Sequence, residues 1–118
     1  MHRYNVTPLQ RYTDRVMTVS FHKAAAGFPF AGVGSVDDVG VGRGSNHSIN
    51  VPLHEGVDDK TFTSIFGAVI SKTIAHFAPN AVVLQCGVSA LAGDRLGQFN
   101  LSCRSFAAIA EMLRDYTQ

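Results

Sequence analysis

The feature that most constrains the fold is a run of apolar residues at helical spacing that leads directly into an apolar strand. Between residues 62 and 77 the apolar positions recur every three or four residues: Phe62, Ile65, Phe66, Val69, Ile70, Ile74 and Phe77. This spacing lines one face of an α-helix. Asp58 or Asp59 can cap the helix by accepting free N–H groups of its first turn. Pro79 ends it, because proline cannot continue a helix.

Three segments have the composition of strands, namely residues 15–21, 46–53 and 81–87. The last segment is nearly all apolar, which is typical of a parallel strand covered on both faces. A second helix is expected over residues 104–116, with one face formed by Phe106, Ile109, Ala110 and Leu113. We therefore predict a single α/β domain over residues 1–118, with three short parallel strands, two main helices and a long Gly-rich loop over residues 23–45.

Composition excludes some classes of function. The formal net charge is +1 and there is no basic patch, so nothing supports nucleic-acid binding. No apolar run is long enough to cross a membrane. Only 16% of the residues are charged, and a small domain buries a modest share of its surface. We therefore expect apolar faces to be covered by other protein subunits or by self-association.

The two cysteines suggest a reducing environment. Cys86 and Cys103 form no CxxC motif and have no zinc-finger spacing to any His or Cys. Both lie among apolar neighbours, which favours buried, reduced thiols. Such thiols fit an intracellular compartment, and the sequence does not distinguish nucleus, cytoplasm and organelle matrix.

Four segments together resemble the class I histone deacetylases. They are residues 14–23 (DRVMTVSFHK), residues 34–53 with their glycines and the NVPL run, residues 81–87 (AVVLQCG) and residues 91–102 (LAGDRLGQFNLS). The resemblance covers roughly residues 6 to 115 in the family's order. It implies part of the α/β fold that these enzymes share with arginase. It also implies zinc-dependent hydrolysis of acetyl-lysine, in which the metal activates water and polarises the substrate carbonyl.

The family's zinc ligands, however, do not carry over to this sequence. The family's loop C-G-x-D-S-L-x-G-D-R reads CGVSALAGDR over residues 86–95, so Ser89 stands where the family has a zinc-binding Asp. The serine that follows in the family motif is also replaced, by Ala90, whereas Cys86, Gly87, Gly93, Asp94 and Arg95 are retained. The metal-binding His falls on Met1, and its partner Asp falls before the chain. We therefore expect no zinc, no other cofactor, and no catalytic residue.

Other family positions are remnants. His22 matches a position beside the substrate channel, and Phe28 matches the aromatic residue that lines it. The family's catalytic His pair and Tyr have no counterpart here, and a retained potassium site near Ser20 and Phe21 is not expected. Two functions remain open. One is a non-catalytic, deacetylase-like structural or interaction subunit of a larger assembly. The other is a fragment of an active zinc-dependent lysine deacetylase.

Overall fold

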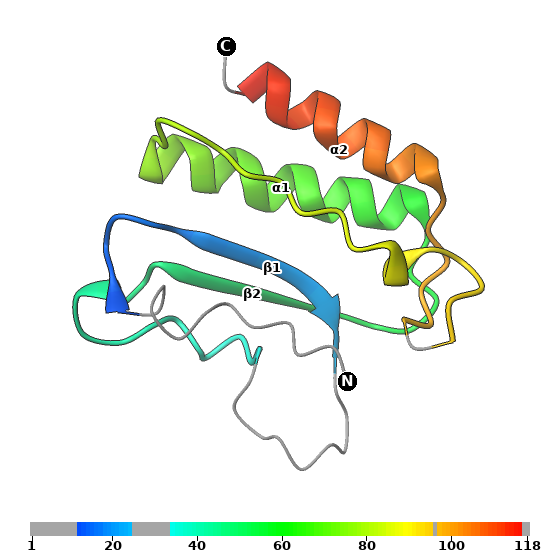
Figure 1. The fold of residues 1–118 in the computed structure, drawn as a ribbon, viewed down its shortest axis with the longest axis horizontal. Coiled ribbons are helices and arrows are strands. Elements are labelled where there is room, and N and C mark those ends of the chain that lie inside the picture. Colours follow the sequence, from blue (N-terminus) through cyan, green and yellow to red (C-terminus); the bar gives the residue numbers. More distant parts are fainter. Residues whose placement is uncertain (1–11, 25–33, 96, 117–118) are drawn as a thin grey trace. The chain divides into compact units, whose positions relative to one another are not determined.

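A computed structural model describes residues 12–24, 34–95 and 97–116 (Figure 1). The chain divides into two compact units, Met1–Leu53 and His54–Gln118. The first unit contains two strands, and the second contains two helices. The α/β class and the partial deacetylase-like character of the fold are confirmed, although the number of strands differs from the prediction.

The first unit is built on a pair of parallel strands. Strand β1 (Thr18–Lys23) pairs with β2 (Ser48–Leu53), with Thr18 opposite Ser48 and Lys23 opposite Leu53. Both strands begin two or three residues later than the sequence predicts. A short 3-10 helix, η2 (Gly42–Gly44), lies between them in the chain. The parallel arrangement agrees with the long connection between the strands, because a tight turn can join only antiparallel neighbours.

The prediction of a third strand is wrong. Residues 81–87 belong to no strand ladder in the described part of the chain, where only β1 and β2 pair. Val82 is 40% exposed and Val83 is 94% exposed. Composition alone makes a segment suitable for a sheet, but a strand also needs a neighbour that accepts its backbone hydrogen bonds. The second unit offers no such neighbour among its described residues.

Helix α1 (Asp59–Phe77) has the ends and the buried face that the sequence predicts. The Asp58 side chain caps its N-terminus by accepting a hydrogen bond of 2.8 Å from the Thr61 N–H. At the other end Ala78 has φ of 50°, and its N–H donates to the Ile74 carbonyl at 2.8 Å. The face that is buried consists of Phe62, Phe66 and Ile70.

The buried face of helix α2 (Cys103–Tyr116) is rotated about the helix axis relative to the predicted face. Ser105, Ile109 and Leu113 are its buried residues, whereas Ala110 is exposed. Ser105 is only 1% exposed, and its hydroxyl donates to the Ser102 carbonyl at 2.9 Å. Because this hydrogen bond satisfies the hydroxyl, a serine can occupy a core position that hydropathy assigns to an apolar residue.

The two helices pack side by side and run in the same direction (Figure 1). At their N-terminal ends the Asp59 carboxylate accepts hydrogen bonds from the backbone N–H and the hydroxyl of Ser102. Further along, Gly67 lies against the Met112 side chain. The shared core contains Phe62, Phe66, Ile70, Phe99, Leu101, Ile109 and Leu113.

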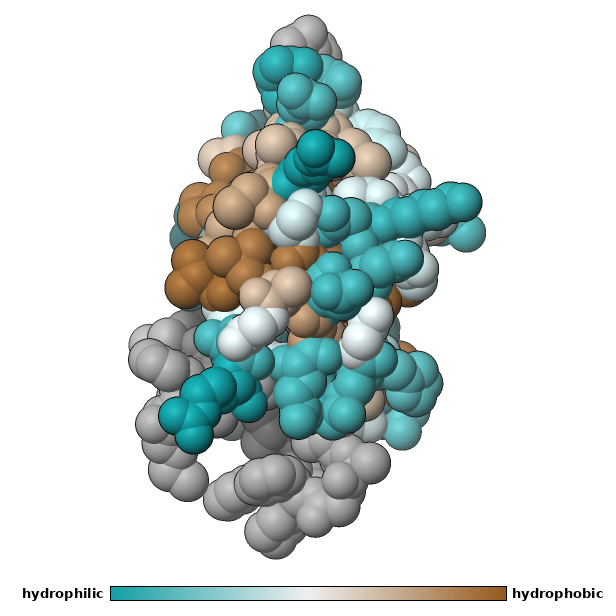
Figure 2. All heavy atoms as spheres, turned by 90° about the vertical axis from the view of Figure 1, so that its right-hand side faces the viewer, coloured by the Kyte–Doolittle hydropathy of each residue, from teal (hydrophilic) through white to brown (hydrophobic). Residues whose placement is uncertain are grey.

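Part of the apolar surface remains exposed. Figure 2 shows hydrophobic side chains grouped on one part of the visible face, beside hydrophilic ones. The described residues include exposed large hydrophobic side chains at Val36, Val83 and Val88. No helix in the described ranges is long and apolar enough to cross a membrane.

Candidate functional site

The candidate site is the loop that carries the family motif, residues 86–97 in the second unit. After Gly87 the chain makes one 3-10 turn, η3 (Val88–Ala90), which holds Ser89. Ser89 is half-buried, whereas Val88 beside it is 73% exposed. Ser89, which the resemblance predicts to stand at a zinc-binding position of the family, therefore lies in a 3-10 turn.

Hydrogen bonds to the segment before α2 hold this loop. Leu91 and Leu101 form a parallel bridge, and the Ala92 N–H donates to the Leu101 carbonyl at 2.8 Å. Leu101 is 2% exposed, so its side chain anchors the bridge in the core. Gly93 follows with φ of 88°, a left-handed conformation that favours glycine. The loop is thus tied to the hydrophobic core on one side.

Asp94 and Gly97, two further residues of the motif segments, shape the other side of the loop. The Asp94 carboxylate accepts a hydrogen bond of 3.0 Å from the Gly97 N–H. Gly97 in turn lies so close to the Ser89 carbonyl that a Cβ atom at position 97 would collide with it. Gly97 is therefore required for the close approach of the two backbone segments, and Asp94 fixes that approach. Arg95 is exposed.

The residues present in this loop do not fit a zinc ion. Ser89 offers a neutral hydroxyl, whereas zinc sites in proteins use thiolate, imidazole or carboxylate ligands. Among the residues that the structure describes, no group of three or more His, Cys, Asp or Glu side chains could hold a metal. No step of a metal-dependent reaction can be assigned to this loop.

His22, which is predicted to match a position beside the family's substrate channel, lies in the first unit, on β1. Its Nε2 atom is 2.8 Å from the Gly34 carbonyl oxygen, and its Nδ1 atom is 3.0 Å from the Ser20 hydroxyl. Because a carbonyl oxygen can only accept, Nε2 carries the proton, and in the neutral ring the Ser20 hydroxyl donates to Nδ1. Both ring nitrogens are therefore engaged within the protein. Phe28, like Met1, lies outside the described residues.

The predicted burial of the two cysteines is wrong. Both Cys86 and Cys103 are exposed, and both are free thiols. Cys86 lies near the end of residues 81–87, the segment that joins no strand ladder in the described structure. Cys103 begins α2, on the side of the helix away from the buried Ser105. The apolar residues next to the cysteines in the sequence are themselves partly exposed, and they therefore do not bury the thiols.

Sequence reasoning missed the acidic residues that join the helices. Asp58 and Asp59 were expected to offer alternative caps for one helix. Instead Asp58 caps α1, and Asp59 binds Ser102 at the start of α2. The Ser102 hydroxyl and N–H hold the pKa of Asp59 below its ordinary value, and the Thr61 N–H does the same for the pKa of Asp58.

Comparison with known proteins establishes the class. The sequence profile of the histone deacetylase domain matches residues 6–118. Because this match covers most of the sequence, the chain belongs to the histone deacetylase family.

Individual relatives agree with this classification. The chain is 48% identical over 104 residues to histone deacetylase clr6 of Schizosaccharomyces pombe and 48% identical over 104 residues to human histone deacetylase 1. It is 51% identical over 104 residues to histone deacetylase 6 of Arabidopsis thaliana. Each alignment covers 88% of this chain but only 25%, 21% and 22% of the respective relative. The chain thus spans about a fifth to a quarter of the curated relatives that it matches.

Proposed function

We propose that this chain is a non-catalytic member of the histone deacetylase family that acts as a structural or interaction subunit of a larger assembly. The observation that carries the proposal is Ser89. By the resemblance, it stands where the family has a zinc-binding Asp, in a loop that also has Ala90 in place of the motif serine but keeps Gly93 and Asp94. The glycine and the acidic residue that shape the loop are therefore kept, whereas the expected metal ligand is not.

The physical argument concerns the charge and the donor strength of one side chain. A carboxylate supplies both a negative charge and a strong donor oxygen to zinc, whereas a serine hydroxyl supplies neither at neutral pH. Zinc activates water only when it is held firmly, because the bound metal lowers the pKa of that water. Replacement of Asp by Ser at this position therefore removes a ligand that zinc-dependent catalysis requires.

Support for an interaction role comes from the surface. Large hydrophobic side chains are exposed in both units, among them Val36 at 65% and Val83 at 94%. Val82 and Val83 are consecutive and both exposed, at 40% and 94%, and exposed apolar side chains that lie together often mark sites of protein contact. Such a surface supports a role in binding other subunits.

The test is a zinc measurement combined with an activity assay on the purified 118-residue chain. We expect substoichiometric zinc by elemental analysis and no hydrolysis of an acetyl-lysine peptide. A histone deacetylase relative, assayed in parallel, serves as the positive control. Stoichiometric zinc together with turnover would overturn the proposal and establish the alternative, an active zinc-dependent lysine deacetylase.

A further inference from the structure

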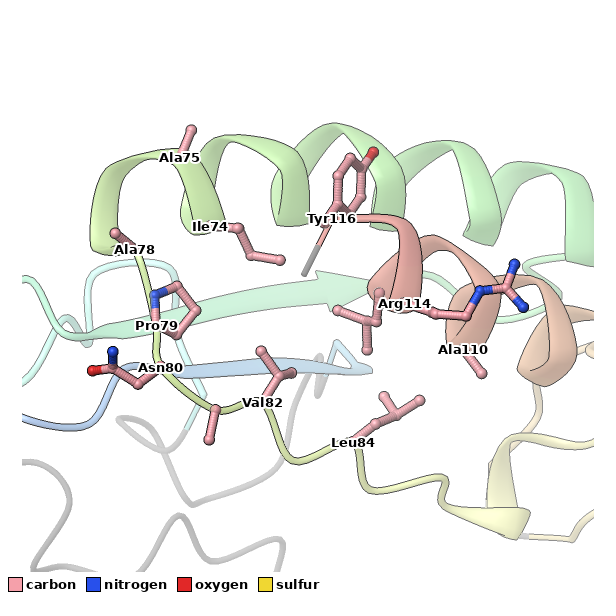
Figure 3. A pocket seen from close by; sticks show the side chains of 12 residues that line it. Ile74, Ala75, Ala78, Pro79, Asn80, Val82, Leu84, Ala110, Arg114 and Tyr116 are labelled. Atoms are coloured by element: carbon pink, nitrogen blue, oxygen red, sulfur yellow. The ribbon is translucent and has the colours of Figure 1, made fainter. Parts of the chain in front are cut away.

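We draw no further inference here: the strongest candidate, the cleft that the C-terminal halves of α1 and α2 form with residues 78–84 in the second unit (Figure 3), carries nothing, because nothing in the structure shows what covers it.

Discussion

Truncation of Leu101 to alanine tests how the motif loop is held. Leu101 is 2% exposed, and its backbone forms the bridge with Leu91 and accepts the Ala92 N–H. Leu101→Ala removes about three carbon groups at roughly 0.8 kcal/mol each, or about 2.4 kcal/mol of transfer free energy. The residual cavity adds to this loss, and Leu→Ala changes in cores cost about 2–5 kcal/mol. We expect a loss of about 3 kcal/mol in the free energy of unfolding.

The assay is urea unfolding followed by circular dichroism at the helical signal, because α1 and α2 share the core that contains Leu101. The midpoint temperature should fall by roughly 10–20 °C in a parallel thermal scan. Val88→Ala is the matched control, since Val88 lies in the same loop but is 73% exposed, and its loss should stay below about 0.5 kcal/mol. A Leu101→Ala variant within about 1 kcal/mol of the wild type would refute the packing described for this loop.

Three further predictions follow from the same residues. Gly97→Ala should lower the thermal midpoint, because the added Cβ collides with the Ser89 carbonyl; a midpoint equal to that of the wild type would contradict the close approach. Asp59 has a pKa lowered from its ordinary value of 3.8, first by the Ser102 hydroxyl, so its stabilising contribution is complete above that value and is lost as the pH falls through the lowered pKa. The urea midpoint of the wild type should therefore fall more steeply than that of Asp59→Asn between pH 5 and the acid limit, and parallel curves would argue against this contribution. Ser89→Asp should not acquire stoichiometric zinc by elemental analysis, because one added carboxylate does not complete a site that needs three or four ligands; stoichiometric uptake would show that further ligands stand nearby.

The sequence predicted the features that depend on residues close together in the chain or on the length of a connection. Helix α1 followed from the spacing of its apolar residues, and its ends followed from Asp58 and Pro79. The parallel pairing of β1 with β2 agreed with their long connection. For α1 the deciding interactions involve neighbouring residues or a pattern that repeats within the helix, whereas the parallel direction of the strand pair is favoured by the length of the connection between the strands.

The remaining features depend on partners that are distant in sequence. Residues 81–87 have the composition of a buried strand, but pairing is a property of two segments and cannot be read from one. The buried face of α2 centres on Ser105 because its hydroxyl finds the Ser102 carbonyl, which hydropathy does not register. Within the candidate site, the motif identified Ser89 and Gly97 individually, but their close contact required the folded loop.

The parallel course of α1 and α2 has a consequence for the chain that joins them. A helix of 19 residues advances about 28 Å, so the connection must return over that distance before α2 can begin beside the start of α1. An extended chain covers it in about nine residues at 3.3 Å each, whereas a helical return would need as many residues as α1 itself. Residues 78–87 cover that distance in an extended path, which leaves residues 88–102 to form the motif loop before α2 begins. An extended return thus makes room for this loop within residues 78–102, which separate the two helices.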